Sequence, residues 1–596
     1  MPAAVFVLLL LSTSLALAQT TATHPSPDAD LAGFWASEQI LRPLARGTLT
    51  IDARSAQWRA QIAGFDIAFE RRQSKDAITF ALPGDAGEFR GHLSRDGKRI
   101  AGHWIQPGVA YPYNPRYASP VELTQVESGV WRGEVIPLEP RLSFYLTIEH
   151  AADRAPYTAY FRNPEANIAR RSYRIVMKEN VVIVMVAGGN AELMGTYDPE
   201  TDRLTLPLIN GYPPLSFART QPDLALGFRP RVPAQHKYVY RKPVVKNDGW
   251  ATASLADVGL AEQPIAGLIE KILAAAPTRD NPVNIHSLLI ARHGKLVLEE
   301  YFYGFDAERT HDMRSASKTF APLLVGLARE HGAKIDVDAP VVSFFTEYKP
   351  LAHPDPRKDR ITVRHLMTMT SGRACRGQWD EDPMQEQTAQ PDWYKFSLDA
   401  PMEREPGGDQ AVYCSSDIHL LGGIVKDTTG RWLPEFFQEY VARPLEMPVY
   451  HMNLTPTGEA YLGGGLYLRP RDQLKLGQIY LSGGTWNGRR IVSEQWAKES
   501  VARRAGFKPL FDIDAGHGYA YAWHVRDHKD GDRVFHDHYA GGNGGQLIIV
   551  IPELDMVVGF TGGDYAEARK FFAWEIELLP QYIIPAALGG QPLPSP

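Results

Sequence analysis

The sequence has only two cysteines among its 596 residues, Cys375 and Cys414. It therefore excludes a disulfide-rich scaffold and a zinc site built from repeated Cys-x-x-Cys motifs. An excess of one charge is also missing, because 63 basic and 69 acidic residues give a net charge of −6. This balance favours neither nucleic acid nor an anionic membrane surface as a partner. No Gly-x-Ser-x-Gly, His-Glu-x-x-His or nucleotide-binding glycine loop is present, so the hydrolase and cofactor classes that depend on them lack support.

Long apolar runs are scarce as well. Residues 3–11 are apolar and precede Ala16-Leu17-Ala18, a small-residue cleavage pattern before Gln19. We interpret residues 1–18 as a secretory signal peptide and expect a secreted, periplasmic protein without a stable membrane span after cleavage. A membrane anchor is the alternative, although the run is shorter than the roughly 20 residues that a span needs.

A chain of this length is expected to hold two or more domains. Residues 31–220 consist of short alternating apolar runs broken by Gly, Pro and Asp-Gly turns, which predicts an all-β region. Gly33-Phe34-Trp35 resembles Gly129-Val130-Trp131. We therefore predict two related antiparallel units, about 31–126 and 127–220, that are barrel-like or sandwich-like. No residue in this region indicates chemistry.

One short stretch carries most of the chemical information, Ser315-Ala316-Ser317-Lys318. A serine hydroxyl is a weak nucleophile and needs a base held against it. Residues three apart on a helix share a face, so Ser315 and Lys318 are expected to lie side by side. Desolvation or a neighbouring charge must favour the neutral amine before a lysine can act as a base. Since Ser-x-x-Lys alone usually marks a solvated helix face, its surroundings decide the interpretation.

Those surroundings favour a catalytic turn. Residues 320–328 repeat apolar side chains at helical spacing, and Gly332 stands where a C-terminal cap would fall. Ser315 would then lie in the first turn, where free backbone N–H groups favour developing negative charge. Upstream, residues 287–298 predict two strands joined at His293-Gly294.

Three further stretches complete a pattern. They are residues 361–372, Tyr413-Cys414-Ser415 before an apolar helix, and Ala540-Gly541-Gly542-Asn543 before an apolar strand. Together with Ser-x-x-Lys and in this order, they make residues 246–585 resemble the penicillin-recognising serine hydrolases. The nearest branch comprises class C β-lactamases, family VIII esterases and DD-peptidase-like enzymes. The resemblance implies an α/β domain, an antiparallel sheet flanked by helices, with an all-helical insertion between Lys334 and about Glu439.

The resemblance also implies roles. Ser315 matches the acylating nucleophile, Lys318 its basic partner, and Tyr413 the tyrosine that passes a proton to the leaving group. The third family motif falls on Ala540-Gly541-Gly542, where Gly541 and Gly542 would contact the substrate. The backbone N–H groups of Ser315 and Asn543 would form the oxyanion hole.

The chain departs from the family in two places. Ser415, expected to contact substrate, replaces the Asn of the second motif, and Ala540 replaces the Lys or His of the third. In the family that cation helps to hold a substrate carboxylate, so both departures disfavour β-lactams and D-Ala-terminated peptides. His538, Arg373 or Arg376 could supply a substitute, although a strand histidine with ordinary contacts is the simpler interpretation of His538.

In the resembled fold, the loops that carry Cys375 and Cys414 both lie near the active site. The resemblance therefore predicts a Cys375–Cys414 disulfide in an oxidising compartment, with two free buried thiols as the alternative. The run His536-Asp537-His538 suggests a metal site, but no distant third ligand is evident and a solvated turn is the better interpretation. No metal or organic cofactor is expected.

We thus predict a multidomain protein: an N-terminal all-β region, a linker at 221–245, the hydrolase-like domain at 246–585 and a tail at 586–596. The expected activity is hydrolysis of a small ester, amide or peptide-like substrate through an acyl-enzyme at Ser315. A peptidoglycan-directed DD-peptidase or β-lactamase is one alternative. A non-catalytic binding protein on a hydrolase scaffold is another.

Overall fold

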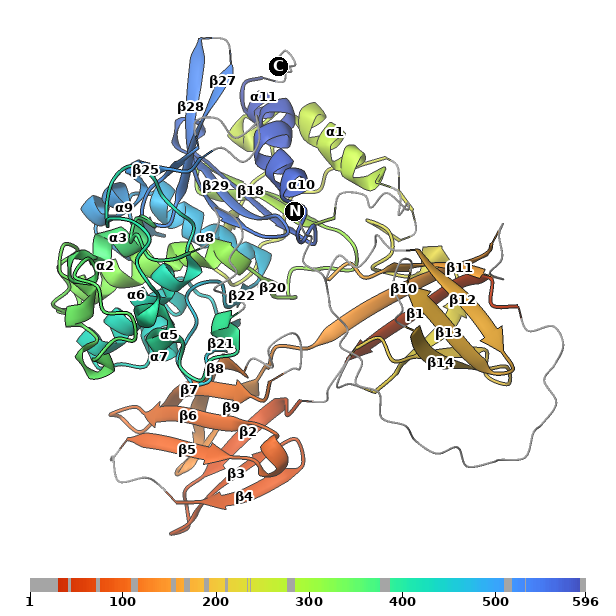
Figure 1. Cartoon of the computed structure of the whole chain (residues 1–596), viewed down its shortest axis with the longest axis horizontal. Helices are drawn as coiled ribbons and strands as arrows, with labels where there is room; N and C mark the ends of the chain where they lie inside the picture. Colours follow the sequence, from red (N-terminus) through yellow and green to blue (C-terminus); the bar gives the residue numbers. More distant parts are fainter. Residues whose placement is uncertain are drawn as a thin grey trace.

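The structure is a computed structural model. It describes residues 30–40, 44–70, 76–108, 116–151, 157–165, 172–186, 192–209, 213–232, 234–235, 237–275, 284–375, 386–508, 517–530 and 532–589. The predicted signal peptide and Arg376 lie outside these residues, as does most of the predicted tail. The chain forms three parts, a closed β-barrel, a second β unit and a large C-terminal α/β domain (Figure 1).

Eight antiparallel strands form the closed barrel. Alternate side chains point inward, and Trp35, Leu146 and Phe217 are fully buried among them. Its strands, in order around the barrel, are β1 (Gly33–Ile40), β10 (Arg141–His150), β11 (Tyr157–Arg162), β12 (Ser172–Lys178), β13 (Val181–Val186), β14 (Glu192–Asp198), β15 (Arg203–Leu206) and β16 (Leu215–Thr220).

The second β unit has its own apolar core, which includes Ile51, Phe89 and Trp104. β8 lies between β7 and β9, and β9 continues through β2 and β3 to β4. The strands are β2 (Gly47–Asp52), β3 (Trp58–Ile62), β4 (Phe65–Phe69), β5 (Ala77–Ala81), β6 (Glu88–Leu93), β7 (Arg99–Gln106), β8 (Arg116–Glu127) and β9 (Val130–Val135).

The two β units exchange strands. The first predicted repeat begins with β1, yet β1 pairs with β10 and β16 and closes the barrel. The second predicted repeat begins with β9, yet β9 pairs with β2 and β8. The two matching tryptophans therefore lie in different cores. Trp35 is buried in the barrel core, and Trp131 is buried in the core of the other unit. The spatial units are therefore not the contiguous segments 31–126 and 127–220.

The C-terminal domain is built on a nine-stranded sheet that is antiparallel except for the short edge pair β17–β19. The predicted hairpin is present, and its turn residues His293 and Gly294 have φ of 51° and 70°, as a tight two-residue turn requires. In sheet order the strands are β17 (Ala251–Thr252), β19 (Lys295–Tyr301), β18 (Ile285–Arg292), β30 (Met556–Gly562), β29 (Gln546–Ile551), β28 (Arg533–Gly542), β27 (His524–Asp530), β26 (Gly518–Tyr519) and β25 (Ala505–Gly506).

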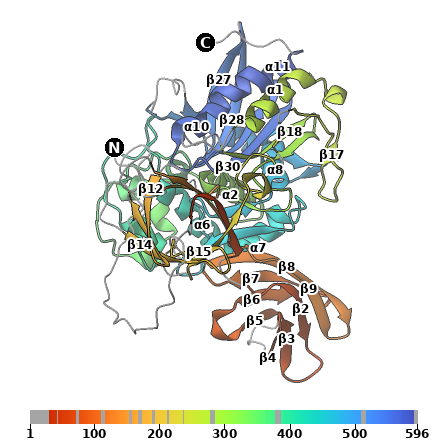
Figure 2. The ribbon, with the colours of Figure 1, turned by 90° about the vertical axis from the view of Figure 1, so that its right-hand side faces the viewer.

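Helices cover both faces of this sheet, as the resemblance implied (Figure 2). On one face lie α1 (Glu262–Leu273), α10 (Ala568–Ala573), the π-helix η11 (Trp574–Ile583) and α11 (Ile584–Ala587). On the other lie α2 (Phe320–Glu330), α3 (Val363–Met367), α5 (Trp393–Asp399), α6 (Ser415–Thr429), α7 (Leu433–Phe437), the π-turn η8 (Gln438–Ala442), α8 (Pro470–Leu481) and α9 (Glu494–Val501). Within the described residues, no helix is both long and apolar enough to cross a bilayer.

A short sheet joins the second β unit to the C-terminal domain. β20 (His311–Asp312) pairs with β22 (Leu466–Leu468), which pairs with β21 (Tyr450–Leu454). β8 of the N-terminal unit then adds to the free edge of β21. Because β20 directly precedes Ser315, the N-terminal unit is part of the framework around that serine.

Candidate active site

Ser315 lies in a tight turn that leads into a buried helix. The turn, η4 (Arg314–Thr319), is a 3-10 helix and continues directly into α2. The predicted helical turn at Ser315 is therefore present, although it is a 3-10 turn and not an α-helical one. Pro322 falls in the first turn of α2, where a missing N–H costs least. Gly332, with φ of 94°, follows the end of the helix as predicted.

The turn brings the serine and lysine together. Lys318 Nζ lies 2.7 Å from Ser315 Oγ and 2.5 Å from the carbonyl oxygen of Gly463. Lys318 is only 1% exposed. Burial favours a neutral amine over an ammonium ion, which is the form a base requires. The Gly463 carbonyl fixes the amine on the nucleophile and was not predicted, although the run Gly463-Gly464-Gly465 was a visible signal for close backbone approach.

Tyr413 lies beside the lysine. Its ring centroid is 4.8 Å from Lys318 Nζ, and the residue is 7% exposed. It stands just before α6, whose first residue is Ser415. The structure therefore brings together Ser315, Lys318 and Tyr413, with the buried Ser415 two residues after the tyrosine.

A disulfide joins Cys375 and Cys414, with their Cα atoms 5.6 Å apart. The predicted pairing is thus confirmed. Cys414 is the N-cap residue of α6 and follows Tyr413 directly. The bridge therefore ties the tyrosine to the loop after Gly372.

The end of β28 packs against the nucleophile turn. A Cβ atom at Gly542 would lie 2.5 Å from the Met313 carbonyl oxygen and 3.0 Å from the Ala316 nitrogen, so only glycine fits. Asn543 follows, and its Oδ1 accepts a 2.9 Å hydrogen bond from the Ala566 N–H. This close contact places the strand end beside Ser315, and the oxyanion-hole role of the Ser315 and Asn543 N–H groups stays a prediction.

Neither described candidate for the missing cation reaches the site. Arg373 forms a buried ion pair with Asp417, whose side chain is 1% exposed. His538 is buried against Trp523, and burial lowers its pKa to about 3. Ala540 itself is fully buried in the core. The hypotheses that His538 or Arg373 replaces the family's cation are therefore wrong, and Arg376 lies outside the described residues.

The His536-Asp537-His538 run is part of β28 and not a solvated turn, so that interpretation was wrong. Adjacent strand residues face opposite sides, which prevents Asp537 from sharing a site with both histidines. Asp537 instead meets His528 at 2.7 Å, and His528 lies 3.2 Å from Glu575. Burial would lower the pKa of His528, but its contacts with Asp537 and Glu575 raise it to about 10.

These three residues are the one set of converging His, Cys, Asp or Glu side chains among the described residues that could hold a metal. Arg526 Nε lies 2.9 Å from Glu575 Oε1. A protonated histidine and an arginine balance the charges of the two carboxylates, so the cluster is neutral without a metal ion. We therefore assign it a structural role, in which it joins the β27–β28 hairpin to η11.

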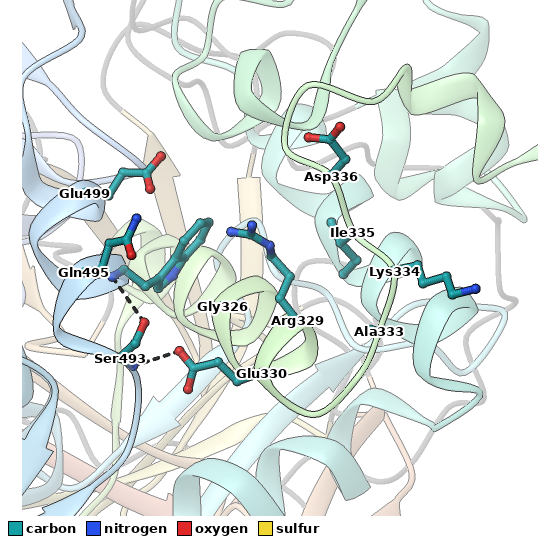
Figure 3. A pocket seen from close by; sticks show the side chains of 11 residues that line it. Gly326, Arg329, Glu330, Ala333, Lys334, Ile335, Asp336, Ser493, Gln495 and Glu499 are labelled. Atoms are coloured by element: carbon teal, nitrogen blue, oxygen red, sulfur yellow. Dashed lines mark hydrogen bonds between the residues drawn. The ribbon is translucent and has the colours of Figure 1, made fainter.

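An open pocket of about 650 Å³ lies between the end of α2 and the start of α9 (Figure 3). Arg329, Glu330 and Glu499 line it, and Glu330 accepts a hydrogen bond from the Ser493 N–H. Ser315 lies before the opposite end of α2. The pocket contains no residue of the Ser–Lys–Tyr group, so it is separate from the candidate active site.

Comparison with known proteins agrees with this geometry. The family model described as Beta-lactamase matches residues 285–570. Residues 285–570 are therefore similar to the serine β-lactamase-like family. A 6-aminohexanoate-dimer hydrolase from Paenarthrobacter ureafaciens is 24% identical to this chain over 232 residues. The match covers 36% of this chain and 57% of that protein, so the chain spans little more than half the length of that relative.

Two solved structures are also similar to this chain. A penicillin-binding protein homologue from Caulobacter crescentus superposes with a TM-score of 0.41 at 15% identity, covering 52% of this chain and 94% of the other. A family VIII carboxylesterase gives a TM-score of 0.39 at 18% identity, covering 55% of this chain and 99% of the other.

Proposed function

We propose that this protein is an exported serine hydrolase that cleaves an ester or amide through an acyl-enzyme on Ser315. The observation that carries the proposal is the 2.7 Å contact between Lys318 Nζ and Ser315 Oγ, with the amine buried and held by Gly463. A nucleophile, a base and an orienting group within hydrogen-bond reach are the signature of an activated serine.

In the first step, neutral Lys318 accepts the proton of Ser315 as Oγ attacks the substrate carbonyl carbon. The C–O bond forms, and the carbonyl electron pair moves onto oxygen to give an oxyanion. The N–H groups of Ser315 and Asn543 would donate to that oxygen, which is the largest stabilising contribution in many acyl transfers. The role of Gly463 is to hold the amine against Oγ, so that little reorganisation is needed.

In the second step, the oxyanion reforms the carbonyl and the bond to the leaving group breaks. The hydroxyl of Tyr413 donates a proton to the leaving alcohol or amine, and Lys318 returns a proton to Tyr413. Water then attacks the acyl-enzyme with the same groups acting as base, which releases the acid and restores the Ser315 hydroxyl. The 4.8 Å distance between the Tyr413 ring and Lys318 Nζ supports this sequence.

Export is the second element of the proposal. It is supported by the signal-like residues 1–18 and by the Cys375–Cys414 disulfide, since disulfides persist in oxidising compartments. Expression of the full chain in a Gram-negative host, followed by fractionation, tests it. We expect periplasmic protein that begins at Gln19, and cytoplasmic protein that retains Met1 would overturn this element.

A fluorophosphonate probe followed by peptide mapping tests the chemistry. We expect one modified residue, Ser315, with labelling lost in Ser315→Ala and nearly lost in Lys318→Ala. Ser317→Ala is the matched control, because Ser317 Oγ donates to the Arg314 carbonyl and not to Lys318. Labelling elsewhere, or ester turnover by Ser315→Ala above a few per cent of wild type, would refute the assignment.

The substrate class is tested on the same preparation. The absence of a cation at Ala540 predicts that p-nitrophenyl butyrate has a higher kcat/KM than nitrocefin. A higher value for nitrocefin, or stable labelling of Ser315 by a fluorescent penicillin, would favour the β-lactamase or DD-peptidase alternative instead.

A further inference from the structure

We propose that Arg314 forms an anion-binding subsite beside the nucleophile, which takes a carboxylate on the acyl part of the substrate. The inference rests on the proposed function and names the substrate class more closely. It concerns a residue that the sequence pattern did not single out, because Arg314 lies just outside the Ser-x-x-Lys motif.

The backbone at Arg314 is held in an uncommon conformation. Its φ is +45°, in the left-handed region that residues with a side chain rarely adopt. Such strain persists where the surrounding structure imposes it, and it concentrates at functional sites. The side chain is 48% exposed, although it belongs to the residue directly before the half-buried Ser315.

Asp312 and Tyr565 orient the guanidinium. Arg314 Nε lies 2.8 Å from Asp312 Oδ2, and the Arg314 backbone N–H donates to Asp312 Oδ1 at 2.9 Å. The guanidinium carbon lies 4.9 Å from the centroid of the Tyr565 ring. A guanidinium has five N–H donors, so the contacts with Asp312 and Tyr565 leave further N–H donors for an anion. Asp312 balances one unit of charge, so recognition would depend mainly on directed hydrogen bonds.

Tyr565 places this guanidinium near the proposed oxyanion hole. A Cβ atom at Gly544 would lie 2.7 Å from the Tyr565 ring, so the ring lies against Gly544, the residue after Asn543. Gly544 also pairs with Asp564, the residue before Tyr565. The leaving group is assigned to Tyr413. A charge that reaches Arg314 beside Asn543 would therefore belong to the acyl part of the substrate.

The N-terminal β unit supports this subsite. Asp312 pairs with Tyr467 across β20 and β22, and Tyr117 of β8 packs edge-on against Tyr467 with ring centroids 5.4 Å apart. β8 thus extends the small sheet that holds Asp312 in place. This contact gives the N-terminal unit a role in shaping the site.

Arg314 could also supply the cation that is missing from position 540. Ala540 carries no charge, Arg373 is neutralised by Asp417, and His538 is buried with a pKa of about 3. Arg314 is also paired, with Asp312, but its side chain is 48% exposed whereas that of Arg373 is 3% exposed, so a substrate can reach Arg314. The substrate carboxylate would therefore bind at Arg314 and not at position 540.

Matched ester substrates test the proposal. Mono-p-nitrophenyl glutarate and p-nitrophenyl valerate have acyl chains of the same length, and only the first carries a carboxylate. We expect Arg314→Gln to lower kcat/KM for the glutarate ester by 10-fold or more and to change that for the valerate ester by less than 2-fold. Arg314→Lys should recover part of the loss, because it restores charge without the bidentate geometry. Arg489→Gln, on an exposed arginine of the two-residue strand β24 (Arg489–Arg490), is the control and should alter the kinetics of neither substrate.

Two results would overturn the subsite. Equal losses for both esters would mean that Arg314 only supports the turn, and unchanged kinetics for both would mean that no carboxylate binds there. Failure of the proposed function would give a different result from failure of the subsite. If Ser315 is not the nucleophile, the Ser315→Ala variant would still hydrolyse the valerate ester.

Discussion

The Cys375–Cys414 bridge should contribute substantially to the stability of the hydrolase domain. The two cysteines are 39 residues apart in sequence. In the chain-entropy treatment, closing a loop of this length removes about 13 cal/mol/K from the unfolded chain, which stabilises the folded domain by about 4 kcal/mol at 25 °C. For a domain of about 300–350 residues, the unfolding entropy is about 0.6–0.7 kcal/mol/K, so losing the bridge should lower Tm by about 5–6 °C.

The assay is calorimetry of the double variant Cys375→Ser/Cys414→Ser beside wild type, each with and without dithiothreitol. Reduction should lower the Tm of wild type by the same amount, about 5–6 °C, and it should leave the Tm of the double variant unchanged. The bridge also borders Tyr413, so we expect a several-fold fall in kcat for ester hydrolysis at temperatures where the variant is folded. A Tm within 1 °C of wild type, or two thiols that alkylate in the unreduced, denatured protein, would refute this reasoning.

Three further predictions concern the site and its supports. Gly463→Ala would place a methyl group 2.4 Å from Tyr461 Oη and displace the carbonyl that holds Lys318, so kcat should fall at least 10-fold by steady-state assay, whereas Gly267→Ala on α1 should not change it. Arg373→Met should cost about 3–5 kcal/mol in urea unfolding, because it leaves Asp417 buried and unpaired; Arg373→Met/Asp417→Leu should regain most of that loss, and no regain would contradict the ion-pair account. The raised pKa of His528, about 10 against 6.5, contributes stability that is fully present below about pH 6.5 and lost as pH rises through 10. The Tm difference between wild type and His528→Gln should therefore shrink over that range, and a constant difference would argue against a protonated histidine.

The nucleophile turn could be predicted because its signals are local. The spacing of Ser315 and Lys318 fixes their approach, and His293-Gly294 has the turn chemistry that a tight hairpin needs. The Cys375–Cys414 pairing followed from the family resemblance, which places two distant loops together. Local spacing and a known framework were sufficient in these cases.

The contacts that could not be predicted join residues far apart in sequence. Lys318 uses a backbone carbonyl of Gly463, 145 residues away, and a carbonyl leaves no side-chain signal. The run around Asp537 was interpreted as a solvated turn because its buried partners could not be seen in the local sequence. One member of that cluster, Glu575, comes from η11, far along the chain. The strand exchange was hidden for a different reason, since Gly33-Phe34-Trp35 and Gly129-Val130-Trp131 are alike and alternation alone does not say which sheet a strand joins.

The exchange of β1 and β9 fixes an order of events during synthesis. Among the described strands, β1 leaves the ribosome first, but its partners β10 and β16 extend to Thr220, so the barrel cannot close until some 180 more residues have been made. The second unit can close once β9 has emerged, and β1 then remains outside it as an unpaired strand. The earliest-made strand is thus exposed the longest, at a stage when a neighbouring chain could capture its edge.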